Sequence, residues 1–358
     1  MLLEQAIKVI VPPTVPEGIL AENWGEYRKT LISAFANEEY GVTPPPPSEV
    51  RASFMEDNHF YDDWCGKAKH TIVKLSFDTP NGEFGFRTDL TFPLSEKPVP
   101  VIVYIAFTPY PHGGFCPMEE VLDHGFGVAS FYYEDVTADC DDHFESGIAA
   151  LYPRNGKNAW GKIGMWAFAA SRVMDYLLTL PQVNHEQIFV LGHSRLGKTA
   201  LWCAAQDLRF CGVASNAAGC SGDAISRVKK GEHIADICSR FPFWFCENYQ
   251  KYAGHENLLP FDQHQLLALI APRPLCIGCA SEDIWADPDS EYLSARLATS
   301  AYDLLSAPGL LAGDHPHIQP GDCFHEGNIG FHCRKGTHFL GRNDWQQYMS
   351  FFREKMQC

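Results

Sequence analysis

The chain has 358 residues, of which 46% are apolar, and it carries a formal net charge of −16. This length and apolar content can bury a large core, and one α/β domain with additions is expected rather than two domains. The acidic balance, with a pI of about 5.3, argues against nucleic acid or an anionic membrane as a partner, because both would repel the chain.

The lack of a recognisable targeting signal and the pattern of cysteines predict a reducing compartment. There is no run of about 18 apolar residues, and residues 1–5 lack the charged, apolar and small-residue order of a secretion signal. The sequence as it stands is expected to be cytoplasmic, or secreted or periplasmic if a leader has been removed. Thirteen scattered cysteines without paired CxxC motifs favour buried, reduced thiols over disulfides or a zinc site.

The first 65 residues differ in composition from the rest. Pro12, Pro13 and the four prolines at 44–47 cannot lie inside a helix. We expect residues 1–65 to form an arm packed on a main body of residues 66–358. Apolar residues at helical spacing predict one helix in the arm, over residues 24–40.

Strand-like and helical segments alternate after the arm. The predicted strands cover residues 99–107, 127–133, 187–191, 212–216, 273–280 and 330–333. The predicted helices cover residues 160–180, 197–206, 289–305 and 343–355. Alternation of this kind is typical of a doubly wound, mostly parallel sheet with helices on both faces.

A candidate nucleophile lies where one predicted strand meets a helix. The segment reads Val190-Leu191-Gly192-His193-Ser194-Arg195-Leu196-Gly197-Lys198. A serine on such a turn is typical of the nucleophile elbow of α/β-hydrolases, which requires small neighbours. Gly197 stands one position later than the usual glycine, and an ordinary helix N-cap is the alternative interpretation of Ser194. Arg195 adds a fixed cation that can stabilise an oxyanion or bind an anionic substrate.

Two further residues complete a possible triad. A serine nucleophile needs a base and usually a carboxylate that orients the base, and α/β-hydrolases present these in the order serine, acid, histidine. Asp283 follows the predicted strand 273–280, and His338 follows the predicted strand 330–333. Glu282 competes with Asp283, because sequence alone cannot separate adjacent residues. A solvated Asp283 and a surface His338 are the alternative.

The segment around Ser194 resembles a family hallmark. Residues 192–198 match the pattern G-[CH]-S-R-x-G-K of the bacterial glucuronoyl esterases, carbohydrate esterase family 15. The resemblance extends over roughly residues 20–355, through segments 169–177, 241–246, 259–264, 270–274, 285–288 and 336–338.

This resemblance implies an α/β-hydrolase that cleaves the ester between 4-O-methylglucuronic acid on xylan and an alcohol of lignin, with no metal or cofactor. It implies that Ser194 is the nucleophile, His338 the base and Arg195 the oxyanion stabiliser. Lys198 corresponds to a lysine that contacts sugar hydroxyls, and Trp285 to a tryptophan that lines the sugar site.

The sequence departs from part of the family in its acid. Many members carry the acid after an earlier strand, in a segment such as Q-E-S-G-x-G-G. Residues 216–222 here read Asn-Ala-Ala-Gly-Cys-Ser-Gly, and alanine cannot serve. The acid is therefore expected after the later strand, where some bacterial members keep it and where Asp283 stands. Asp223 is a third choice.

Arg240 and one glycine motif have two interpretations each. Arg240 is either a second basic contact for the substrate or a cover over the aromatic run 241–245. His112-Gly113-Gly114 is either an oxyanion-loop motif like that of lipases or a plain glycine turn.

One histidine-rich segment is a weak metal candidate. It lacks zinc-finger or helical spacing and is rich in glycine and proline, so we expect an irregular loop and no metal. The residues concerned are His315, His317, Cys323, His325 and Glu326.

Three other functions are weighed against the glucuronoyl esterase. An acetylxylan esterase on the same fold is the nearest, but a neutral acetyl group needs no basic pair such as Arg195 and Lys198. A non-catalytic carbohydrate-binding protein is less favoured, because serine, acid and histidine are all retained, and a peptidase is weaker still. The expected partner is a carbohydrate ester, and the expected state is a monomer.

Overall fold

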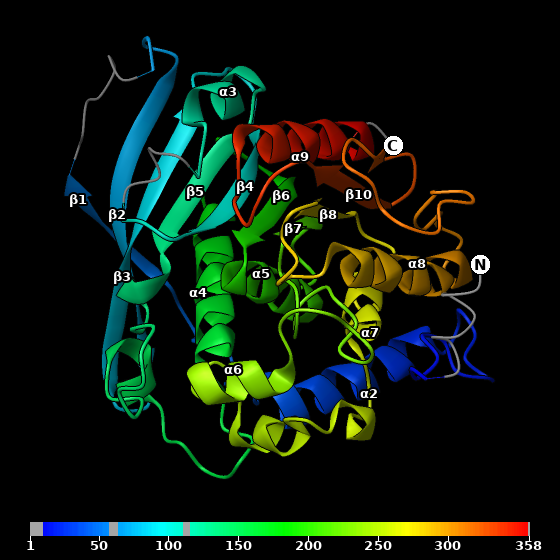
Figure 1. The fold of residues 1–358 in the computed structure, drawn as a ribbon. Helices are drawn as coiled ribbons and strands as arrows, with labels where there is room; N and C mark the ends of the chain where they lie inside the picture. Colours follow the sequence, from blue (N-terminus) through cyan, green and yellow to red (C-terminus); the bar gives the residue numbers. More distant parts are fainter. Residues whose placement is uncertain (1–9, 57–63, 110–114, 357–358) are drawn as a thin grey trace.

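The computed structural model describes residues 10–56, 64–109 and 115–356, and a ten-stranded sheet forms its centre (Figure 1). The strands are β1 (Arg51–Glu56), β2 (Ala68–Thr79), β3 (Gly82–Pro93), β4 (Val99–Ala106), β5 (Gly127–Tyr132), β6 (Val183–His193), β7 (Gly212–Asn216), β8 (Leu275–Ala280), β9 (Cys323–Phe324) and β10 (Ile329–Arg334). Their order across the sheet is β1-β2-β3-β5-β4-β6-β7-β8-β10-β9.

Helices of several lengths connect the strands. The α-helices are α2 (Trp24–Phe35), α3 (Met118–Asp123), α4 (Lys162–Leu177), α5 (Arg195–Gln206), α6 (Ile234–Arg240), α7 (Gln263–Ala268), α8 (Pro288–Leu304) and α9 (Arg342–Lys355). A π-helical turn, η1 (Ala36–Tyr40), follows α2, and the 3₁₀ segments are η2 (Tyr133–Asp135), η3 (Gly147–Leu151), η4 (Glu247–Tyr252) and η5 (Glu256–Leu258).

The middle of the sheet is parallel. The strands from β5 through β4, β6, β7 and β8 to β10 pair in parallel, whereas β1, β2 and β3 at one edge and β9 at the other pair antiparallel. Helices cover both faces, with α3 and α9 on one side and α4, α5, α7 and α8 on the other (Figure 1). The doubly wound α/β fold predicted from the sequence is confirmed.

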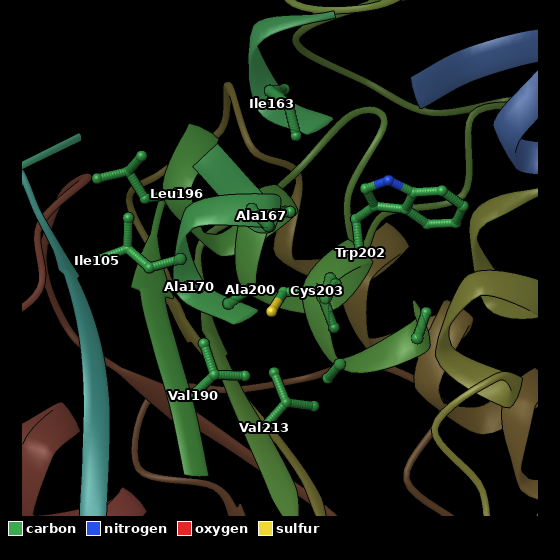
Figure 2. Packing of buried hydrophobic residues seen from close by; sticks show 14 of the residues in the cluster. Ile105, Ile163, Ala167, Ala170, Val190, Leu196, Ala200, Trp202, Cys203 and Val213 are labelled. Carbon is green, nitrogen blue, oxygen red and sulfur yellow. The ribbon is translucent and has the colours of Figure 1, made fainter. Parts of the chain in front are cut away.

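Alternation along the central strands builds the two layers of core. Val103 and Ile105 of β4 belong to the cluster under α4 and α5, and Ile102 and Tyr104 belong to the cluster under α3 and α9. Figure 2 shows the first layer, in which small residues on the two helices face strand valines. Each aliphatic side chain buried fully in this way contributes about 1.5–3 kcal/mol.

Three strands at one edge have no counterpart among the predicted elements. In β2 and β3, polar side chains are buried among the apolar ones: the His70 imidazole donates to the Asp89 carboxylate at 3.0 Å, and Arg87 also binds Asp89. A buried charged group interrupts the apolar pattern that identifies a strand. The predicted helix over 24–40 is also corrected, because it changes from α-helix to π-helix at Ala36.

The arm contributes to the core. Phe35 of α2 stacks on Phe261 with ring centroids 3.9 Å apart, and Tyr40 stacks on Trp202 at 4.5 Å. Further along, β1 pairs with β2 and extends the sheet. The arm is thus integrated with the main body, and the boundary at residue 65 stays a prediction. No helix in the described ranges has both the length and the apolar content needed to cross a membrane.

A buried histidine fastens the start of the described chain to α7. The His264 Nε2 donates to the Pro12 carbonyl at 2.9 Å, and its buried Nδ1 has no hydrogen-bond partner within the part of the chain that the structure describes. Burial lowers the pKa of His264 to about 4, so the folded protein holds this imidazole neutral.

We therefore predict acid-sensitive stability. Between the unfolded pKa of about 6.5 and the folded value, the unfolded chain binds a proton that the folded chain does not, so the free energy of unfolding falls as pH falls through this window. Replacing the titrating ring in His264→Gln removes up to about 1.4 kcal/mol per pH unit of this slope. Urea unfolding as a function of pH measures it, and the exposed His185→Gln is the control. Equal slopes in wild type and His264→Gln would contradict the prediction.

Candidate active site

The candidate nucleophile lies on a strained turn at the carboxyl end of β6. Ser194 has φ 57° and ψ −128° between the last residue of β6 and the first of α5, a conformation that costs a non-glycine residue about 1–3 kcal/mol. A Cβ atom on Gly192 would lie 1.9 Å from the Leu196 carbonyl oxygen, so only glycine fits. Gly197 is less constrained, since its Cβ would approach Ser215 and Ala218 at 3.1 Å.

A chain of hydrogen bonds joins the three predicted triad residues. The Asp283 Oδ2 lies 2.6 Å from the His338 Nδ1, and the His338 Nε2 lies 2.8 Å from the Ser194 Oγ. A carboxylate only accepts, so Nδ1 carries the proton and Nε2 is free to accept from the serine hydroxyl. Asp283 is buried, whereas the His338 side chain is 41% exposed, as a base that meets substrate requires.

The structure separates Asp283 from its competitors. Glu282 is exposed, and its backbone N–H donates to the Gly336 carbonyl at 2.9 Å. Asp223 is buried beneath β7, where it accepts from the Ser215 hydroxyl and the Gly219 N–H, both at 2.7 Å. Among these carboxylates, Asp283 is the one that bonds His338.

The Arg334 side chain stabilises the loop that carries His338. The Arg334 guanidinium donates to the carbonyls of Thr337, at 2.8 Å, and of Phe339. Its Nε donates to the Asp344 Oδ2 at 2.9 Å, and Asp344 Oδ1 accepts from the His332 Nε2 at 3.1 Å. The main chain on both sides of the base is therefore fixed by one cation.

Arg195 lies beside the serine and is positioned by Asp139, which sequence reasoning missed. The buried Asp139 carboxylate accepts from Arg195, from the Tyr133 hydroxyl at 2.9 Å and from the Trp244 indole at 2.7 Å. The guanidinium also lies 4.7 Å from the Trp244 ring centroid. Its Nε is buried and has no hydrogen-bond partner among the described residues.

Lys198 and Trp285 meet at a second carboxylate that the sequence did not indicate. The Lys198 ammonium is buried, donates to the carbonyls of Ala218 and, at 2.6 Å, Cys220, and lies 3.8 Å from Glu232 Oε2. The Trp285 indole donates to Glu232 Oε1 at 3.2 Å, while the residue as a whole is 46% exposed. Trp285 is thus an exposed surface for a ligand rather than a core residue.

His193, next to the serine, packs against the catalytic imidazole. The rings of His193 and His338 lie 4.6 Å apart, and the His193 Nδ1 donates to the Asn216 side-chain oxygen at 2.8 Å. Burial, with the nearby His338, lowers the pKa of His193 to about 3. A neutral ring at this position adds no second positive charge when His338 takes a proton.

A small cavity of about 140 Å³ is lined by Ser194, His338, Arg195, Lys198, Glu232 and Trp285. Arg240 lies at its edge, and its guanidinium lies 5.1 Å from the Phe241 ring centroid, as a cover over the aromatic run would; its contact with a substrate stays a prediction. Ala217 and Ala218 line its wall. A hollow of about 510 Å³ beside the prolines at 44–47 is larger but holds none of the triad groups.

Two further predictions concern a glycine motif and a histidine-rich segment. The His112-Gly113-Gly114 motif falls outside the described residues. The histidine-rich segment is spread out: His315 bonds the Ala312 carbonyl, and His317 lies 3.5 Å from Asp289. His325 alone of that segment turns inward, to within 3.7 Å of Cys276.

Comparison with known proteins identifies the family. Residues 76–306, more than half of the chain, match the family profile described as fungal glucuronyl esterase. The chain belongs to the glucuronoyl esterase family. This membership confirms the family predicted from the residues around Ser194.

Individual glucuronoyl esterases and their relatives agree with the profile. A carbohydrate esterase from an unknown prokaryotic organism is 43% identical over 65% of this chain, and the chain spans 54% of that protein's length. A 4-O-methyl-glucuronoyl methylesterase from Wolfiporia cocos is 26% identical over 82% of the chain and 72% of its own length.

Solved structures of the family superpose over almost the whole chain. A glucuronoyl esterase from Solibacter usitatus is 30% identical with a TM-score of 0.85, covering 96% of this chain and 97% of its own. A promiscuous esterase of carbohydrate esterase family 15 from a marine bacterial metagenome is 31% identical with a TM-score of 0.84, covering 96% of each chain.

Replacing the acid of the hydrogen-bonded chain tests its assignment. Asp283→Asn leaves His338 without a charged acceptor and allows the wrong tautomer, so kcat is expected to fall by about 10⁴-fold. The neighbouring Glu282→Gln is the matched control and is expected to retain kcat near wild type. Steady-state kinetics on an activated ester measures both, and a larger loss in Glu282→Gln would reverse the assignment.

A double-mutant cycle tests whether Asp139 acts through Arg195. Asp139→Asn removes the charge that holds the guanidinium, and we expect kcat/KM to fall about tenfold, within the roughly 0.5–3 kcal/mol usual for coupled neighbours. In an Arg195→Ala background the same change is expected to cost little. Equal losses in the two backgrounds would mean that Asp139 acts independently of Arg195.

Proposed function

We propose that this protein hydrolyses esters of glucuronic acid or 4-O-methylglucuronic acid through a serine-bound acyl-enzyme. The observation that carries the proposal is the hydrogen-bonded series Ser194, His338 and Asp283, which opens on a cavity lined by Arg195, Lys198 and other polar groups. Relatives named 4-O-methyl-glucuronoyl methylesterase support glucuronic acid as the acid part of the substrate ester.

The reaction begins with the serine. The His338 Nε2 accepts the hydroxyl proton as the Ser194 Oγ attacks the C6 carbonyl of the uronate ester, and a tetrahedral oxyanion forms. When this intermediate collapses, the alcohol leaves with the proton from His338. Water, deprotonated by His338, then attacks the acyl-enzyme and releases glucuronate and the free serine.

The oxyanion is stabilised from two directions. α5 begins at Arg195, so the first backbone N–H groups and the positive end of the helix dipole lie at the serine. The Arg195 side chain adds a full positive charge that Asp139 holds in place. One such donor is typically worth about 3 kcal/mol, or two orders of magnitude in kcat.

The polar wall suits a hydroxylated ring. Lys198 offers a donor, Glu232 an acceptor and Trp285 an exposed aromatic face, a combination that matches the hydroxyls and the apolar face of a sugar. The cavity of about 140 Å³ is smaller than the roughly 300–1,000 Å³ typical of drug-sized pockets. We infer that it takes the uronate ring and leaves the alcohol at the rim.

The decisive experiment compares two esters. Hydrolysis of benzyl glucuronate is measured beside that of 4-nitrophenyl acetate, in wild type, Ser194→Ala and Arg195→Ala. We expect activity largely on the glucuronate ester, its loss in Ser194→Ala, and a kcat about 100-fold lower in Arg195→Ala.

Other outcomes select other functions. Serine-dependent activity on acetate alone would make the protein an acetyl esterase. Activity on neither ester would contradict glucuronate ester hydrolysis and favour a binding function. Normal turnover in Arg195→Ala would remove that residue from oxyanion stabilisation.

A further inference from the structure

Three metal-ligand side chains meet in the core layer beneath α9, away from the cavity at Ser194. Cys276 lies on β8, His332 on β10, and His325 in the short turn between β9 and β10. All three are buried, with 0%, 2% and 9% of their surface exposed. One ligand atom from each lies within 4.8 Å of the other two.

The pairing of β8 with β10 brings these residues to one face of the sheet. Cys276 lies beside Gly330, and His332 lies beside Gly278, so each large side chain faces a glycine on the neighbouring strand. A Cβ atom on Gly330 would lie 3.1 Å from the Cys276 sulfur, and one on Gly278 would lie 2.6 Å from the His332 ring. The glycines keep the space that the cysteine and the imidazole occupy.

The separation of the first two ligands suits a small, thiolate-binding cation. The Cys276 Sγ lies 3.7 Å from the His325 Nε2. Zinc bonds of about 2.3 Å to sulfur and 2.0 Å to nitrogen at a tetrahedral angle place the two ligand atoms roughly 3.5 Å apart. The observed spacing therefore needs little adjustment.

His332 is prepared as a ligand by its other nitrogen. Its Nε2 donates to Asp344 at 3.1 Å, so Nδ1 carries the lone pair, and none of the described residues offers this buried Nδ1 a hydrogen bond. A carboxylate that fixes the tautomer of a histidine in this way is usual at metal sites. Burying an unpaired nitrogen is unfavourable, and a bound cation would offset this cost.

We propose that Cys276, His325 and His332 bind one Zn²⁺ ion, with a fourth position left for water. Binding converts the Cys276 thiol to a thiolate and releases one proton to solvent, while both imidazoles bind as neutral ligands. The ion joins β8, β10 and the turn after β9 beneath α9. The expectation of no metal rested on the spacing within one segment, whereas these three ligands come from three segments.

Metal content tests the site directly. The full chain, freed of metal with a chelator, is incubated with Zn²⁺ and desalted, and bound zinc is measured by mass spectrometry. We expect about one zinc per chain, and Co²⁺ in its place is expected to give a thiolate-to-cobalt charge-transfer band. Cys276→Ala is expected to lose both signals.

Cys279→Ala is the matched control. Cys279 is also a buried thiol of β8, but it belongs to the core on the opposite face of the sheet. It is expected to keep the zinc and the cobalt band. His325→Gln provides a second ligand variant in a turn, should Cys276→Ala fold poorly, and it is expected to lose the zinc.

A thermal shift gives an independent readout. At a hundredfold excess of Zn²⁺ over its Kd, Tm is expected to rise by about 3–4 °C in wild type and Cys279→Ala, with no rise in Cys276→Ala or His325→Gln. Absence of bound zinc in the wild type would overturn the proposal. Equal zinc in wild type and the ligand variants would overturn it as well.

Discussion

In the register of β8 and β10, Ala280 lies beside Arg334, so the loops that leave the two strands start at the same level. The first loop carries Asp283 and the second carries His338, and backbone hydrogen bonds such as that from the Ser281 N–H to the Arg334 carbonyl keep them together. Because parallel strands present their carboxyl ends at one edge, Ser194 at the end of β6 faces the same side. Strand pairing thus sets the geometry of the candidate triad.

The two cations of the site lie at the end of α5 where the helix dipole disfavours positive charge. Arg195 and Lys198 lie in the first turn of α5, where the helix dipole disfavours positive charge. Carboxylates from outside the helix compensate: Asp139 for the arginine and Glu232 for the lysine. The same contacts restrict the two side chains, so an electrostatic cost in folding accompanies a site that is ordered before substrate arrives.

Local pattern predicted the central part of this molecule well. The strand 212–216 has the predicted bounds, and the helices α4, α5, α8 and α9 lie within three residues of their predicted ends. Apolar periodicity is strong in these elements because each packs on a sheet covered on both faces. At the edge, buried polar pairs such as His70 and Asp89 hide the pattern of β2 and β3.

The candidate site was predictable only in part. Motif order pointed to Ser194 and His338, but the choice between Asp283 and Glu282 depends on which side chain turns inward after β8, and adjacent residues share every sequence signal. Asp139 is 56 positions from Arg195, and no spacing rule connects them. Such contacts follow from tertiary packing, as does the meeting of Cys276 with a histidine from another strand.

The contact of Arg334 with the main chain on both sides of His338 affects which residues the neighbouring positions can accept. Arg334 binds the carbonyl oxygens of Thr337 and Phe339, and both of these residues are exposed. Any residue that keeps the backbone conformation supplies the same acceptors. The side chains at these two positions are therefore free to diversify among descendants of this sequence, while the imidazole stays where it is.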